Sequence, residues 1–210
     1  MPAATVIALL GAESTGKSSL ALALARELAL AGVDAAVVPE ALRGFCDTHG
    51  RTPRVDEQPA LALAQTAHIA AAAQSHSVVL ADTTALMTAV YSDIYFGDAS
   101  LYPAAVDAHR TAHLTLLTTL DLPWSPDGIQ RDGPAMRAAV DARLRSILRD
   151  HGVAFSVVPG EGSQRVQAAL RTVWRCLHPP REPAGTPRWR WVCQHCGDGG
   201  CEAAAFALAR

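Results

Sequence analysis

The stretch "GAESTGKS", residues 11–18, decides the fold of this chain. It fits the pattern G-x-x-x-x-G-K-[ST], follows the apolar run "TVIALL" (5–10) and leads into an Ala/Leu-rich helical pattern over 17–31. A strand, a glycine-rich turn and a helix N-terminus, in that order, form the context in which this pattern binds phosphate. The sequence therefore predicts a phosphate-binding loop, or P-loop, between the first strand and the first helix.

The residue types of this loop predict how it would bind a nucleotide. Gly11 and Gly16 allow a tight turn in which backbone N–H groups surround the phosphates, and the helix N-terminus adds partial positive charge. Lys17 is expected to act catalytically at the β- and γ-phosphates, and the Ser18 hydroxyl is expected to ligate Mg²⁺. The predicted nucleotide-binding set is Gly11, Glu13, Ser14, Thr15, Gly16, Lys17, Ser18 and Ser19.

Lys17 is the only lysine of the chain, although lysine and arginine together number 18. A compact ammonium fits between phosphates where a planar guanidinium does not. A single lysine at this position therefore favours a nucleoside triphosphate site, with ATP and Mg²⁺ as the expected cofactors, over a chance Gly/Ser turn.

Short apolar runs alternate with helical patterns along the rest of the chain. The runs are rich in Val and Thr and are bounded by Gly, Pro or Asp, which is typical of buried strands; they are 5–10, 33–39, 77–82, 113–120 and 153–159. Apolar residues recur at helical spacing over 134–150 and 163–177. This alternation predicts an α/β fold, a three-layer sandwich with helices on both faces of a five-stranded parallel sheet.

The composition of the chain argues against several other classes of protein. The formal charge of −2 and the lack of a basic stripe argue against nucleic-acid binding, and no segment is apolar enough for a membrane span. The N-terminus lacks the basic region of a signal peptide, so a cytoplasmic protein is expected. We predict a kinase-like domain over 1–177, a Pro-rich linker over 178–188 and a Cys-rich tail over 189–210.

Two acids follow predicted strands at the edge of the sheet where ligands of open α/β folds bind. Asp82 is placed either to hold Mg²⁺ through water or to act as the catalytic group that takes a proton from an attacking hydroxyl. Alternatively, it only caps the helix that begins near Thr84. Glu40 and Arg43 are placed either to bind the acceptor or to form an i,i+3 surface pair.

The segment "YSDIYFGD", residues 91–98, has two interpretations. Asp93 and Asp98, with the aromatic residues beside them, either line the acceptor pocket or belong to an ordinary turn after a partly buried helix.

The loop "DLPWSPDGIQRDGP", residues 121–134, follows the fourth predicted strand and so lies at the same edge. Arg131 is the candidate catalytic arginine of a lid over the phosphates, and Arg137 is a second candidate. Trp124 offers a flat face for stacking on an aromatic or cationic ring, and Asp127 could bind ribose hydroxyls or a carboxamide. Alternatively, Trp124 fills the edge of the core and Asp127 belongs to a turn.

The order of these segments resembles the ribosylnicotinamide kinase domain of NadR-like proteins. The similar pieces are "GAESTGKS", "PEALR", "VVLADTT" and "DLPWSPDGIQRDG", spread over about residues 4–177. The resemblance implies the strand order 2-3-1-4-5 of nucleotide kinases and the transfer of phosphate from ATP to nicotinamide riboside in NAD salvage, with Trp124 stacked on the cationic ring. The family often carries an acid at the position of Thr84. The further domains of its bifunctional members are not expected here.

The tail segment "CQHCGDGGCE" contains Cys193, Cys196 and Cys201 in a C-x2-C-x4-C array, with His195 inside it. Thiolate and imidazole ligands suit a structural Zn²⁺, but the second C-x2-C half-site is missing. The alternatives are a zinc knuckle, reduced surface thiols or an unstructured tail.

Together these observations predict a kinase of nicotinamide riboside, with no nucleic-acid or membrane partner. Two rival functions stay open: a kinase of another nucleoside or small metabolite, and a nucleotide-dependent regulatory ATPase.

Overall fold

The computed structural model describes residues 3–125 and 133–179. Its centre is one sheet of five strands in the order β2-β3-β1-β4-β5, and every neighbouring pair is parallel. The strands are β1 (Thr5–Leu10), β2 (Ala35–Val38), β3 (Val78–Asp82), β4 (Leu114–Thr118) and β5 (Ser156–Val158). This confirms the predicted fold class and strand order.

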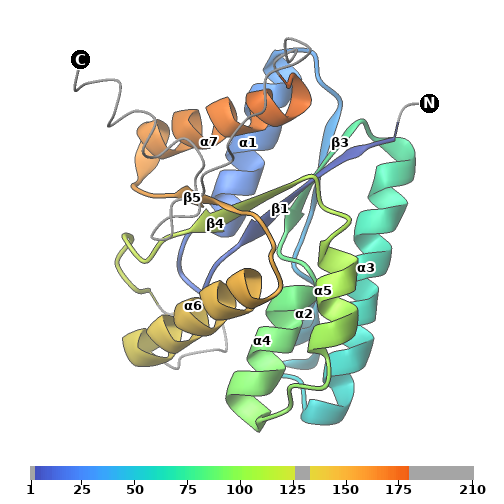
Figure 1. Ribbon diagram of the computed structural model, residues 1–210, viewed down its shortest axis with the longest axis vertical. Coiled ribbons are helices and arrows are strands. Elements are labelled where there is room, and N and C mark those ends of the chain that lie inside the picture. The colour runs from blue at the N-terminus through green and yellow to red at the C-terminus, as the bar shows by residue number, and fades with distance from the viewer. Residues whose placement is uncertain (1–2, 126–132, 180–210) are drawn as a thin grey trace.

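Helices cover both faces of the sheet, as Figure 1 shows. On one face lie α1 (Lys17–Leu30) and α7 (Gly162–Leu177), whose apolar side chains pack with those of β1, β3 and β4. The other face carries the remaining helices, namely α2 (Ala41–His49), α3 (Gln58–Ser75), α4 (Ala85–Phe96), α5 (Tyr102–His109) and α6 (Gly133–Asp150), with the short 3-10 turn η1 (Val55–Glu57) before α3. The result is a three-layer sandwich.

The central strands are apolar along their whole length because both of their faces are covered. Ile7, Leu9 and Leu80 are fully buried, as the nearly unbroken runs of Val, Leu and Ala predict for a parallel sheet. All five strands run in one direction, so their carboxyl ends meet at one edge. The loops that follow these ends carry the candidate functional residues.

The predicted elements and the observed ones differ mainly in length and number. The strand predicted over 153–159 is only Ser156–Val158, and that over 33–39 is Ala35–Val38. The helices α2, α3 and α5 were not predicted from the sequence. The sequence of α3 contains no Asp, Glu, Lys or Arg, so its polar and apolar residues do not separate into two faces at helical spacing.

Among the described helices, none combines the length and apolar character that crossing a bilayer requires. Most of the predicted linker and the whole predicted Cys-rich tail, with Cys193, His195, Cys196 and Cys201, lie outside the described residues.

Candidate nucleotide and acceptor site

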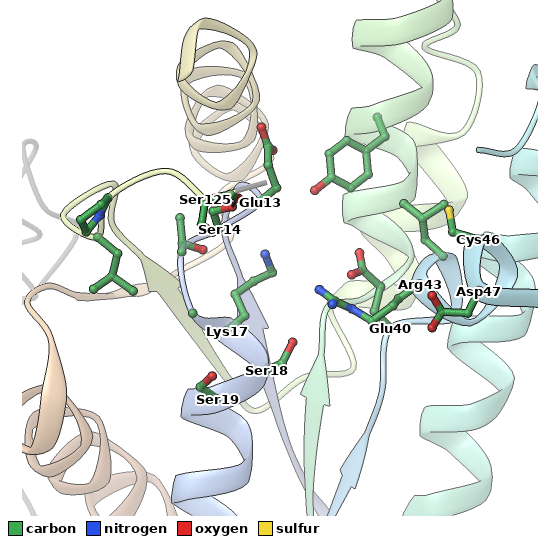
Figure 2. A pocket seen from close by; sticks show the side chains of 16 residues that line it. Glu13, Ser14, Lys17, Ser18, Ser19, Glu40, Arg43, Cys46, Asp47 and Ser125 are labelled. Carbon is green, nitrogen blue, oxygen red and sulfur yellow. Dashed lines mark hydrogen bonds between the residues drawn. The ribbon is translucent and has the colours of Figure 1, made fainter. Parts of the chain in front are cut away.

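A cleft of about 480 Å³ opens at the carboxyl edge of the sheet, a size typical of small-molecule sites. The P-loop and the start of α1 form one side, and α2 forms the other (Figure 2). The described lining residues are Glu13, Ser14, Thr15, Gly16, Lys17, Ser18, Ser19, Glu40, Leu42, Arg43, Cys46, Asp47, Tyr91, Leu122, Pro123 and Ser125. The structure thus brings the predicted nucleotide-binding residues 13–19 together with Glu40 and Arg43.

The two P-loop glycines are required by backbone shape and by space. Gly11 has a φ of +145°, and a Cβ built there would lie 2.0 Å from Thr118 Oγ1 of β4. Gly16 has a φ of +72° and caps the N-terminus of α1; its Cβ would lie 2.9 Å from Leu122 and 3.1 Å from the Arg165 guanidinium. Side chains are disfavoured at both positions, as the motif predicts.

Buried hydroxyls hold the turn of the loop from beneath. Thr118 Oγ1 donates to Thr15 Oγ1 over 2.7 Å, and Thr15 Oγ1 donates to the carbonyl of Ala12 over 2.7 Å. Both threonines are fully buried, so this chain of hydrogen bonds ties the P-loop to the end of β4 without water.

Lys17 carries its ammonium into the cleft while most of its side chain is buried (Figure 2). Its Nζ donates to the Ala12 carbonyl over 2.8 Å. Burial lowers the pKa of Lys17, and the nearby carboxylates of Glu40, Asp82 and Glu13 oppose that shift. An anionic phosphate beside Nζ would likewise favour the charged form.

Two buried arginines brace the P-loop from behind. Arg165 of α7 donates to the carbonyl of Thr15 over 2.7 Å. Arg137 of α6 donates to the carbonyls of Leu122 (2.8 Å) and Ser14 (3.3 Å). Both side chains are only 5% exposed. Arg137 was predicted as a lid arginine, and here it contacts the loop backbone; Arg165 was not predicted, because nothing in a sequence links it to a loop 150 residues away.

The side of the cleft opposite the P-loop is formed by α2 and α4. Glu40 precedes α2 as its N-cap residue, and Arg43, Cys46 and Asp47 follow on that helix. Burial raises the pKa of the Cys46 thiol, which keeps it protonated. Tyr91 of α4 is buried, and its burial together with the nearby carboxylates of Glu40 and Glu13 raises its pKa well above the usual range. Cys46 and Asp47 were not predicted, because the helix that presents them was not.

Asp82 ends β3 and lies just behind the cleft, with 4% of its surface exposed. It does not cap the following helix: Thr84 does, since its hydroxyl accepts from the N–H of Leu86. The Asp82 Oδ1 atom is buried and has no hydrogen-bond partner among the described residues. The Asp82 carboxylate acts on the charge of Lys17, so it lies close to the P-loop lysine. Such a carboxylate oxygen with spare acceptor capacity, and the Ser18 hydroxyl of the motif, are hard oxygen ligands of the kind that Mg²⁺ prefers.

The hydroxyl of Thr84, the N-cap residue of α4, is hydrogen-bonded to a buried histidine. That hydroxyl lies 3.0 Å from Nδ1 of His109, whose Nε2 lies 2.9 Å from Thr115 Oγ1. His109 is 1% exposed, and burial lowers its pKa to about 4, so the ring is neutral at physiological pH.

The described start of the 121–134 loop is hydrogen-bonded to the P-loop and to the turn before α7. Ser14 Oγ donates to the Ser125 carbonyl, and Asp121 accepts from the N–H of Gly160. Pro123 and Ser125 line the cleft, whereas Trp124 between them is partly buried and is not among the lining residues. Asp127 and Arg131 lie outside the described residues.

Asp93 and Asp98 do not line the cleft. Asp93 accepts from the Tyr102 hydroxyl over 2.8 Å and pairs with Arg143 at 3.0 Å, and Asp98 accepts from the N–H of Ser100 over 2.9 Å. Their role in the described structure is to hold the helix end and the turn.

A parallel sheet in this order, with a glycine-rich loop between β1 and α1 and a buried lysine at its end, defines the class of P-loop nucleotide-binding proteins. The AAA domain family (AAA_28) matches residues 6–165, which is more than half of the chain. The chain belongs to this family.

Solved structures show the same fold. The NadR protein in complex with NAD and AMP-PNP is 19% identical, with a TM-score of 0.68, covering 87% of this chain and 52% of that one. The NadR protein in complex with NR is 20% identical, with a TM-score of 0.66 and coverages of 87% and 53%. The chain thus spans about half the length of these NadR chains.

Two solved kinases also share the fold, with lower TM-scores. Thymidylate kinase from Ehrlichia chaffeensis is 15% identical, with a TM-score of 0.54 and coverages of 84% and 100%. Deoxyadenosine kinase from M. mycoides is 12% identical, with a TM-score of 0.53 and coverages of 82% and 98%. No curated protein matches the sequence.

Proposed function

We propose that this protein is an ATP-dependent kinase of a small alcohol acceptor and that the acceptor is nicotinamide riboside. The observation that carries the proposal is the cleft itself, in which the P-loop on one side faces a carboxylate-rich acceptor side on the other. The phosphate donor and a hydroxylated acceptor would meet between them.

The charge of the lining favours a neutral or cationic acceptor over an anionic one. Glu13, Glu40 and Asp47 line the cleft. The basic residues among the described lining are Lys17 at the P-loop and Arg43 of α2, so the acids outnumber the bases. A nucleoside monophosphate would bring about two more negative charges beside these carboxylates, and like charges at close range repel. A riboside with a cationic ring would instead be attracted.

The loop at Trp124 adds a second line of support. Its neighbours Pro123 and Ser125 line the cleft, and Ser125 is fastened to Ser14 of the P-loop. The indole itself is not among the lining residues, so we propose that it turns toward the cleft when the acceptor binds and stacks on the flat cationic ring by cation–π attraction. The likeness of the fold to NadR in complex with NR agrees with this choice of acceptor.

The residues of the chain suggest a division of roles. Lys17 would neutralise charge on the transferring phosphoryl group, and the backbone N–H groups of the P-loop would hold its position. Asp82 would accept the proton of the attacking hydroxyl or hold the metal together with Ser18, and Glu40 with Arg43 would bind the acceptor's polar groups. When bound, Mg²⁺ would supply charge neutralisation between the phosphates. Asp127 and Arg131 are proposed to assist at the ribose and the phosphate.

A panel assay tests the proposal. Release of ADP is measured with ATP, Mg²⁺ and each of a set of nucleosides, nucleoside monophosphates and nicotinamide riboside. We expect turnover on nicotinamide riboside, with the product identified as the mononucleotide by mass spectrometry. Turnover of another acceptor, with none on nicotinamide riboside, would reject the assigned substrate and keep the kinase; ATP binding without turnover of any acceptor would favour the regulatory ATPase.

The role of Trp124 is tested separately with a matched control. Trp124→Ala should raise the KM for nicotinamide riboside about 2- to 30-fold, the range of a cation–π contact, whereas Trp124→Phe should retain much of the affinity. The KM for ATP should stay unchanged in both. An unchanged acceptor KM in Trp124→Ala would mean that the indole only packs against the loop.

A further inference from the structure

The side chain of Gln65, on α3, forms hydrogen bonds with the segments that follow two neighbouring strands, β2 and β3. Its Oε1 accepts from the N–H of Ala41 over 2.7 Å, and its Nε2 donates to the carbonyl of Thr83 over 3.3 Å. Ala41 directly follows Glu40, and Thr83 directly follows Asp82. One buried amide, 1% exposed, therefore links the residues next to the two acids.

These contacts continue the sheet where its own pairing stops. Strands β2 and β3 are paired up to Val38 and Ala81, and β1 and β3 up to Leu9 and Asp82. One residue further on, the N–H of Thr83 still donates to the Leu9 carbonyl over 3.0 Å, while β2 no longer pairs with β3. The Gln65 amide takes the place of a peptide group in that gap.

The chain conformation at Thr83 shows why this support matters. Thr83 has a φ of +72°, a left-handed conformation that is unfavourable for a β-branched residue and persists only when its surroundings hold it. Its N–H is held by Leu9 and its carbonyl by Gln65. The direction in which the chain leaves Asp82 therefore depends on the Gln65 amide.

We propose that Gln65 is a positioning residue that fixes the separation between Glu40 and Asp82, and thereby the place of the acceptor hydroxyl relative to the P-loop. It acts through backbone groups and does not touch the substrate. This inference rests on the proposed kinase function for its catalytic consequence, whereas the structural link can be measured without any acceptor.

A matched pair of variants tests the proposal. Gln65→Met keeps the length of the side chain but removes both hydrogen bonds. Gln58→Met makes the same change at a second buried glutamine of α3, whose side-chain oxygen has no partner among the described residues. Misplacement of reacting groups by about 1 Å can reduce rates about 100-fold. We expect kcat/KM for the acceptor to fall about 10- to 100-fold in Gln65→Met, with ATP affinity within about twofold of the wild type, and to stay near the wild-type value in Gln58→Met.

The Gln65→Glu variant should show a pH dependence of activity that a simple loss of packing would not produce. In Gln65→Glu the protonated acid can still accept from Ala41 and donate to Thr83, but the carboxylate would place an oxygen against the Thr83 carbonyl. Burial near other acids raises the pKa of such a carboxyl group. The activity of Gln65→Glu relative to the wild type should therefore rise as the pH is lowered from 8 to 6, and that of Gln65→Met should not.

Amide hydrogen exchange separates failure of this inference from failure of the proposed function. Peptides that contain Ala41 and Thr83 should exchange faster in Gln65→Met than in the wild type and in Gln58→Met. If the wild type phosphorylates no acceptor, the kinase proposal fails and the exchange result alone decides the link. Unchanged exchange in Gln65→Met, or equal losses of activity in Gln65→Met and Gln58→Met, would overturn the inference.

Discussion

Replacing Gly11 with alanine should damage the fold through a contact that a second substitution can relieve. A Cβ at this position would lie 2.0 Å from Thr118 Oγ1, far inside van der Waals contact. Overpacking of a tight site costs about 1–3 kcal/mol. The φ of +145° adds the strain of a backbone conformation that side chains rarely adopt, a further ~1–3 kcal/mol. Gly11→Ala should therefore destabilise the protein by about 2–6 kcal/mol.

The Thr118→Ala variant isolates the steric part of this loss. On its own it removes the hydroxyl that bonds Thr15 and should cost about 1–2 kcal/mol. In the double variant the clash with Oγ1 is absent, while the strain of the positive φ remains. The double variant should therefore be destabilised less than the sum of the two single variants, by about 1–3 kcal/mol. Free energies of unfolding from urea titrations of the four proteins give this coupling. Additivity within about 0.5 kcal/mol would refute the steric explanation.

Three further outcomes are expected. The pKa of His109 is about 4 in the folded protein and higher in the unfolded chain, so the stability that its neutral form contributes is complete above pH 6.5 and is lost as the pH falls toward 4, by about 3 kcal/mol. Urea unfolding at several pH values should show this loss in the wild type and not in His109→Asn. The same pH dependence in both proteins would contradict the assignment. Arg165→Ala should leave the buried carbonyl of Thr15 without its donor and lower stability by about 1–3 kcal/mol, whereas an exposed change such as Arg171→Ala should have little effect. Glu40→Gln should raise the KM for the acceptor more than that for ATP, and the opposite order would place Glu40 on the donor side.

The sequence predicts those parts of the site that depend on local geometry. The motif over 11–18 identifies the phosphate side because strand, glycine turn and helix follow one another directly. The positions of Glu40, two residues after β2, and of Asp82, the last residue of β3, are predictable because parallel strands place their carboxyl ends at one edge. No comparable local rule predicts α2, so Cys46 and Asp47 of the cleft were missed.

The supports behind the site depend on contacts between distant parts of the chain. Gln65 belongs to a helix with little contrast between its faces, and its partners lie 24 and 18 residues away. Arg165 reads as one basic residue of an amphipathic helix, although it is buried against the P-loop. For Trp124 the residue type alone predicted a place in the site. In the described structure Pro123 and Ser125 line the cleft and the Trp124 side chain does not.

The most direct test of the central claim is a reaction of the full chain with ATP, Mg²⁺ and nicotinamide riboside, in which ADP and nicotinamide mononucleotide are both quantified. The wild type should form the two products in equal amounts. Lys17→Ala should keep its fold by circular dichroism and lose turnover by about 1000-fold or more, because the ammonium that neutralises the phosphates is removed. A folded wild type that binds ATP and phosphorylates a nucleoside monophosphate but not nicotinamide riboside would contradict the account.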